Sequence, residues 1–130
     1  MAINGQINPV GSTLERYPQI SGSVNVRYER NLAGDWDGFV NGQWLHTGKM
    51  YDTTANVAWT APSNTFHTSI GARNGTYSVE IFVRNLFDSK VPTNILRYAN
   101  PNSAVTQGVN MIILAPPERR SIGVRLGLNF

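Results

Sequence analysis

The sequence RRSIGVRLGLNF, residues 119–130, alternates from Ile122 onward between apolar residues and polar or small ones. The apolar side chains stand at every second position: Ile122, Val124, Leu126, Leu128 and Phe130. A period of two predicts a β-strand with one apolar face and one polar face. Arg125 lies in the middle of the polar face, so we expect that face to stay in contact with water.

The composition is that of one weakly charged, β-rich domain. The 130 residues carry a net charge of +3, contain 15% charged residues and include no cysteine. The basic residues are spread thinly, which gives no basis for nucleic-acid binding, and neither disulfides nor thiol chemistry is available. No apolar run approaches the roughly 18 residues of a membrane-spanning helix. Residues 1–19 lack the features of a secretory signal, so we expect a mature chain or a piece of a longer protein.

Four further segments share this alternation and are predicted to be strands of roughly ten residues each: 20–30, 36–46, 64–73 and 77–87. Residues 1–18 read as a loop. The predicted connections are alternately tight and long: 31–35, 47–63, 74–75 and 88–117. Asn74-Gly75 predicts a two-residue type I′ hairpin. Within the long loops, residues 56–60 could extend a strand, and residues 94–98 and 109–114 are candidates for a local hairpin.

Ten-residue strands joined alternately by tight turns and long loops are typical of outer-membrane β-barrels. We therefore predict an all-β fold, an antiparallel up-and-down meander of about five transmembrane-type strands within a larger outer-membrane β-barrel. Apolar side chains would face lipid and polar ones the lumen. Aromatic residues at the strand ends predict two girdles: Tyr28, Trp36, Tyr77 and Phe130 by the tight turns, and Trp44, Phe66 and Phe87 by the long loops.

Three motifs carry a resemblance to a known family. Asn85-Leu86-Phe87-Asp88 closes a strand that follows a tight hairpin, PERRSIG at residues 117–123 runs into the terminal Phe130, and Tyr17-Pro18 opens the first strand. In this order and spacing they resemble the C-terminal end of a TonB-dependent outer-membrane receptor, over essentially the whole chain from about Leu14.

The resemblance implies a barrel of about 22 strands filled by a plug domain. It implies energised uptake of a scarce nutrient, such as a ferric siderophore, across the Gram-negative outer membrane. Residues 1–130 would be a single partial domain, with the plug and signal peptide missing and the C-terminus at the periplasmic side. The implied partners are outer-membrane lipid, the rest of the barrel and its plug, the TonB complex through that plug, and the barrel-assembly machinery. The terminal alternation ending at Phe130 resembles the signal that this machinery recognises. No cofactor is expected.

Six charged residues of the predicted strands fall on the lumen side: Arg27, Glu29, Arg73, Glu80, Arg84 and Arg125. They could line a path for an anionic ligand, but we interpret them as groups that pair with one another or with a plug. Ligand contacts are expected instead in the long loops, where the candidates are Tyr51, Trp59, Arg97 and Tyr98.

The sequence offers no basis for an enzyme or a metal site. His46 and His67 have no ligand-spaced partners, and Asp35, Asp37 and Asp88 read as turn formers. No nucleophile elbow, phosphate-binding loop or dinucleotide glycine pattern occurs.

Two other architectures share the alternation. A small soluble all-β binding module, such as a sandwich or a lipocalin-like barrel, would bury the apolar faces that include Val24, Ile81 and Leu126. A small complete outer-membrane barrel would need an even strand count near eight, with extra strands drawn from the loops.

Overall fold

The computed structural model describes residues 2–3, 6–7, 10–99 and 110–129, and every regular element among them is a β-strand. The predicted all-β fold is therefore confirmed. These residues form two compact units. One consists of residues 22–46, 64–90 and 118–130, and the other of residues 1–21, 47–63 and 91–117. No helix capable of crossing a membrane is found in the described part of the chain.

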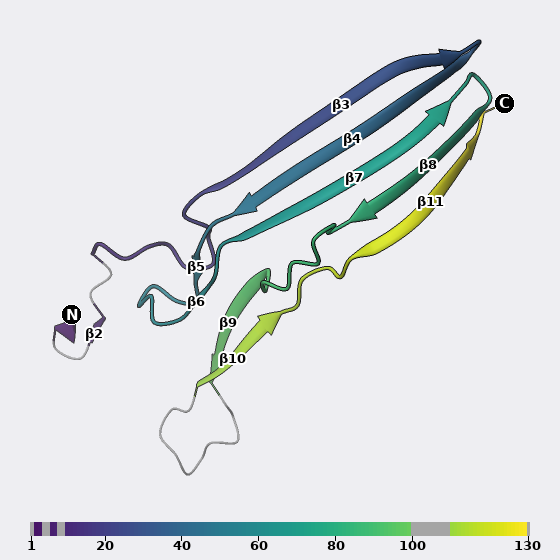
Figure 1. The fold of residues 1–130 in the computed structure, drawn as a ribbon. Coiled ribbons are helices and arrows are strands. Elements are labelled where there is room, and N and C mark those ends of the chain that lie inside the picture. Colours follow the sequence, from purple (N-terminus) through teal and green to yellow (C-terminus); the bar gives the residue numbers. More distant parts are fainter. Residues whose placement is uncertain (1, 4–5, 8–9, 100–109, 130) are drawn as a thin grey trace. The chain divides into compact units, whose positions relative to one another are not determined.

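The first unit is one five-stranded sheet in the order β11-β8-β7-β4-β3, in which neighbouring strands alternate in direction (Figure 1). Its strands are β3 (Ser21–Ala33), β4 (Trp36–Thr47), β7 (Ser63–Arg73), β8 (Tyr77–Arg84) and β11 (Ser121–Leu128). Each of them corresponds to one of the five predicted strands. The expected antiparallel meander is thus confirmed.

The first tight turn is shorter than predicted. We expected a turn over residues 31–35, but β3 continues to Ala33 and only Gly34 and Asp35 form the turn. The side chain of Asn31 explains the difference, because its Nδ2 donates to the carbonyls of Gly34 (3.0 Å) and Trp36 (3.3 Å) from within the strand. Gly34 supplies the positive φ (58°) that the reversal requires.

The second hairpin turns one residue later than Asn74-Gly75 predicted, and its turn type differs. The N–H of Asn74 donates to the carbonyl of Tyr77 (2.8 Å), so Gly75 and Thr76 are the central residues. Neither Asn74 nor Gly75 has a positive φ, so the predicted type I′ geometry is wrong. The Asn74 side chain replaces it, because its Oδ1 accepts from the N–H groups of Thr76 (2.9 Å) and Tyr77 (2.6 Å).

The second unit consists of short hairpins built from the predicted loops. β1 (Ala2–Ile3) pairs with β2 (Gln6–Ile7) inside the segment expected to be a loop, and β5 (Met50–Tyr51) pairs with β6 (Trp59–Thr60). β9 (Asn94–Ala99) pairs with β10 (Asn110–Ala115), which confirms the candidate hairpin except at Val109, which lies outside the described residues. The buried hydrophobic residues of the described chain, Met50 and Ile95, both belong to this unit.

The register of the large sheet separates its side chains onto two faces. Val124 lies opposite Ile81 and Leu126 opposite Val79 on one face, while Arg125 lies opposite Glu80 on the other. The apolar face is uncovered, since Val124 remains 63% exposed and Leu126 76%. We call these two surfaces the apolar face and the polar face.

Candidate functional site

The polar face carries an open hollow of about 610 Å³. All five strands of the sheet contribute to its lining. The polar and charged side chains around it include Asn25, Arg27, Asn41, Gln43, His67, Ser69, Glu80, Arg84, Glu118 and Arg125. The alternation places them together because every second residue of each strand points to this side. Four of the six residues predicted to face a lumen therefore line one hollow.

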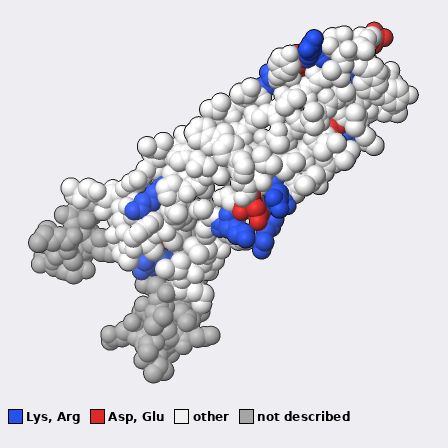
Figure 2. Space-filling model, in the orientation of Figure 1, with Lys and Arg blue, Asp and Glu red and all other residues white. Residues whose placement is uncertain are grey.

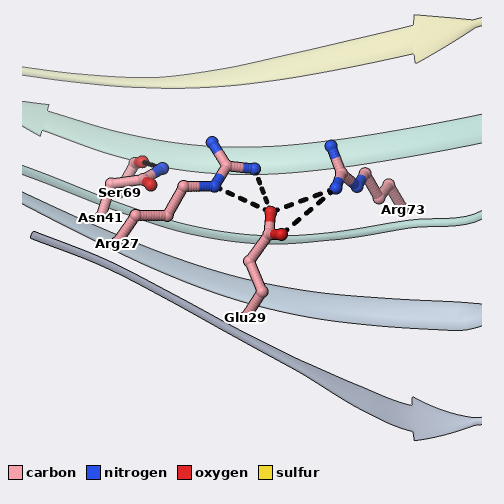
Figure 3. A network of polar contacts seen from close by, with 5 residues as sticks. All are labelled: Arg27, Glu29, Asn41, Ser69 and Arg73. Carbon is pink, nitrogen blue, oxygen red and sulfur yellow. Dashed lines mark hydrogen bonds and ion pairs between the residues drawn. The ribbon is translucent and has the colours of Figure 1, made fainter.

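Glu29 is the centre of a charge network on this face (Figure 3). Its Oε1 accepts hydrogen bonds from Nε (2.8 Å) and Nη2 of Arg27, and Nη2 of Arg73 lies 3.1 Å away. Nearby, Asn41 Nδ2 donates to Ser69 Oγ at 2.9 Å. Two guanidinium groups thus share one carboxylate, which leaves this network with a net charge of +1.

A second network joins β8 to β11. Arg125 Nη1 donates to Glu80 Oε2 at 2.5 Å, in the same register that pairs the two strands. The ring of Phe82 lies between two guanidinium groups, with Arg84 at 5.5 Å and Arg125 at 5.4 Å from the ring centroid. A Cβ atom at Gly123 would collide with this ring. Glycine at that position therefore leaves room for the Phe82 ring on the polar face.

All six predicted lumen residues lie on the polar face, and each has an ionic partner there. The sixth, Arg84, is 3.5 Å from Glu118. With three carboxylates for four cations, only a small excess of positive charge is left on this face for an anionic ligand. The arrangement favours the interpretation of these residues as paired groups over that of a ligand path.

Asn85 has a structural role beside the site that its place in the Asn85-Leu86-Phe87-Asp88 motif did not predict. Its side chain is buried (2% exposed), its φ is +47°, and its Nδ2 donates to the carbonyls of Glu118 (2.7 Å) and Ser89 (3.1 Å). Its Oδ1 accepts from the N–H of Ser89 (2.9 Å), and Asp88 Oδ1 accepts from the N–H of Arg120 (3.2 Å). We call residues 85–90 and 118–120 the clasp, because they tie the end of β8 to the start of β11.

The aromatic side chains predicted at the loop ends contact one another. The rings of Trp44 and Phe66 stack at 6.5 Å, and Phe66 meets Phe87 edge to face at 5.1 Å. Trp36 and Tyr77 line a shallow depression at the tight-turn end of the apolar face. Tyr28 lies five residues before the end of β3 rather than at it, since that strand runs on to Ala33.

The terminal residues also fall on the apolar face. Ile122, Val124, Leu126 and Leu128 lie opposite apolar or aromatic residues of β8. Phe130, which the sequence analysis assigned to the girdle and to the assembly signal, lies outside the described residues.

The predicted loop contacts lie in the second unit, where they have different surroundings. Tyr51 and Trp59 meet edge to face with centroids 6.3 Å apart, and Lys49 Nζ lies 4.8 Å and 4.1 Å from their rings. Tyr98 is exposed. Arg97 instead holds the buried carboxylate of Asp52, with its Nε 2.6 Å from Oδ2. This gives Arg97 a structural partner and leaves the aromatic pair as the open surface.

The surroundings of Asp52 favour the charged form of its carboxylate. Burial raises the pKa of Asp52, but hydrogen bonds from the Ala58 N–H (3.1 Å) and the Arg97 guanidinium outweigh the burial and hold the pKa below its ordinary value of 3.8.

Both histidines form hydrogen bonds with protein groups. His46 Nδ1 contacts Asn64 Oδ1 at 2.9 Å, and His67 Nδ1 accepts from the N–H of Asn85 at 3.2 Å. Among the described residues, no group of three or more histidines and carboxylates could hold a metal ion. Asp35 lies in the first tight turn and Asp88 in the clasp.

Comparison with protein-family models, with curated proteins and with solved structures gives no match to this chain.

Proposed function

We propose that this chain is the C-terminal barrel segment of a TonB-dependent outer-membrane receptor. The observation that carries the proposal is the exposed apolar face of a single-layered antiparallel sheet whose other face holds paired charges. In an outer-membrane barrel the first face meets lipid and the second meets the wet interior. The receptor would take up a scarce nutrient, such as a ferric siderophore, with energy delivered by the TonB complex.

The alternative of a soluble binding module needs a layer that covers the apolar face. Fully burying one aliphatic side chain of this size contributes about 1.5–3 kcal/mol, and a soluble fold depends on that gain. Val24, Ile81 and Leu126 stay exposed, and the unit that contains the sheet has no second layer among its described residues. Lipid is the solvent in which such a face is stable without cover.

The alternative of a small complete barrel needs more strands. The loops do supply β5, β6, β9 and β10, but these pair in two separate hairpins and not with the large sheet. Five strands leave β3 and β11 as open edges, and unpaired backbone groups in hydrocarbon cost several kcal/mol each. A larger barrel, as in the receptor family, supplies neighbours for both edges.

The clasp supports the family resemblance on physical grounds. Asn85-Leu86-Phe87-Asp88 and PERRSIG are 29 residues apart between Asp88 and Pro117, yet Asn85 bonds Glu118 and Asp88 bonds Arg120. These two motifs, which lie apart in the sequence, thus contact each other. This contact sets where the last strand begins.

Membrane fractionation of the expressed chain tests the proposal. We expect the chain to partition with membranes or detergent micelles, and to need detergent to remain dispersed after extraction. Recovery of a folded, soluble monomer without detergent would overturn the receptor assignment and favour the soluble module.

A further inference from the structure

The fold brings Lys90 close to the consecutive residues Arg119 and Arg120. Asp88 accepts a hydrogen bond from the N–H of Arg120 and lies 3.9 Å from Lys90 Nζ, so Lys90, Arg119 and Arg120 belong to one small region of the clasp. Arg119 and Arg120 are exposed and form no ion pair within the described part of the chain, and Lys90 is 75% exposed. We call Lys90, Arg119 and Arg120 the basic cluster.

This cluster borders the apolar face. Its sequence neighbours Phe87 and Ile122 are 69% and 71% exposed, and Phe87 packs against Phe66 at the loop end of that face. Figure 2 shows charged side chains gathered where β8 ends and β11 begins, beside a broad surface over the strands with few charges. Apolar surface and cations thus meet along one border.

At this border four cations, Arg84, Lys90, Arg119 and Arg120, face the two carboxylates of Asp88 and Glu118, which leaves a net charge of +2. At the tight-turn end, Asp35 and Asp37 are offset by Arg30 and Arg73. A lipid has the complementary pattern, because its acyl chains are apolar and its phosphate is anionic. Basic groups beside an apolar surface attract anionic lipid at about 1 kcal/mol per Lys or Arg.

We propose that the basic cluster binds the phosphate-bearing headgroup of an anionic membrane lipid whose acyl chains lie on the apolar face. The inference rests on the proposed function, because it takes the apolar face to be in lipid. It adds a preferred lipid chemistry and a preferred end of the strands, so the loop end of the sheet would sit in the leaflet that carries anionic headgroups.

Vesicle flotation of the full 130-residue chain tests this site. We compare vesicles of phosphatidylcholine alone with vesicles that also contain phosphatidylglycerol, for the wild type, for Arg119→Gln/Arg120→Gln and for the matched control Arg16→Gln/Arg30→Gln. The control removes the same net charge from two arginines that are not members of the basic cluster. We expect the wild type to prefer anionic vesicles, the first variant to lose about 25-fold of that preference, at about fivefold per cation, and the control to keep it.

Each outcome bears on one claim. Equal losses in both variants, or no preference in the wild type, would overturn the headgroup site. Displacement of the chain from anionic vesicles by millimolar inorganic phosphate would point to a free-phosphate site and would also overturn it. Failure of every variant to bind phosphatidylcholine vesicles would count against the proposed function itself, because that binding depends on the apolar face alone.

Discussion

The single residue Asn85 turns the chain at the end of β8 and positions the start of β11. Its left-handed backbone turns the chain at the end of β8, and its buried amide bonds backbone groups of Ser89 and Glu118. Asparagine tolerates this conformation better than most residues and also carries both a donor and an acceptor. The same side chain therefore bends one strand end and positions the next strand.

Replacement of Asn85 separates these two contributions. Asn85→Ala removes three hydrogen bonds of a buried amide and places a Cβ in the left-handed region, so we expect the free energy of unfolding to fall by about 3 kcal/mol. Asn85→Gly loses the same bonds without the steric cost and should be about 1 kcal/mol less damaging. Urea unfolding in detergent micelles measures both. Equal, negligible effects would show that the clasp does not hold the strand.

The ion pair between Asp52 and Arg97 gives the second unit a pH dependence. Because the pKa of Asp52 is lowered in the folded state, its contribution to stability is present above the ordinary value of 3.8 and is lost as the pH falls through the lower folded pKa. We expect protection of the Asp52 amide, which bonds the Ala58 carbonyl (2.9 Å), to decline below about pH 4. Hydrogen exchange measured against pH checks this.

Asp52→Asn is the matched variant. It keeps the side-chain volume but removes the charge, so we expect a loss of about 2 kcal/mol at neutral pH, with no further step on acidification. A step of unchanged size in Asp52→Asn would assign the pH dependence to another group.

At the scale of the element, β8 and β11 are held in register by complementary surfaces as well as by their ladder. Gly123 lies opposite Phe82, and the ring covers the space that a Cβ would occupy. We expect Gly123→Ala to destabilise the sheet by about 1–3 kcal/mol, because the ring must move or the strands must part.

A double-mutant cycle identifies this cause. Phe82→Ala should remove most of the penalty of Gly123→Ala, whereas Gly22→Ala on the edge strand β3, where a Cβ meets nothing within 4 Å, should be close to neutral. Denaturant titration of the four proteins gives the coupling energy. If the effects of Gly123→Ala and Phe82→Ala are additive, the penalty of Gly123→Ala comes from the backbone and not from the Phe82 ring.

Alternation was enough to predict the five long strands and their faces, because a period of two specifies which side chains share a face. It could not predict the ends of the elements. Asn31 extends β3 by bonding carbonyls across the turn, and Asn74 caps its own hairpin in a geometry other than type I′. Such short-range side-chain bonds compete with the backbone preference that a dipeptide such as Asn-Gly suggests.

For the site, the sequence likewise predicted which face the residues share but not all of their contacts. The six charged residues were placed on the polar face correctly, since face follows from position along a strand. Their partners were not all foreseeable, because the approach of Arg84 to Glu118 and of Asn85 to the Glu118 carbonyl depends on how two loop segments fold against each other.

At the scale of the whole molecule, the assignment of the two faces makes opposite predictions for the same substitution. Val124→Arg introduces a charge at the middle of the apolar face and should lower the stability of the chain in vesicles by about 2–4 kcal/mol. Gln43→Arg, on the hollow of the polar face, should cost far less because that side stays hydrated. Urea titration after insertion into neutral vesicles compares the two. Similar costs would mean that the apolar face is not in lipid.

The direction of the two edge strands limits which partner could complete the sheet. Neighbouring strands alternate in direction across the sheet, so its two edges, β3 and β11, run the same way (Figure 1). A second copy of this chain in the same orientation could join only by parallel pairing. A partner that completes an antiparallel ring must contribute an odd number of strands, with its first and last strands both opposed to β3. The number and direction of strands in any partner that closed this sheet into an antiparallel barrel are therefore constrained by β3 and β11.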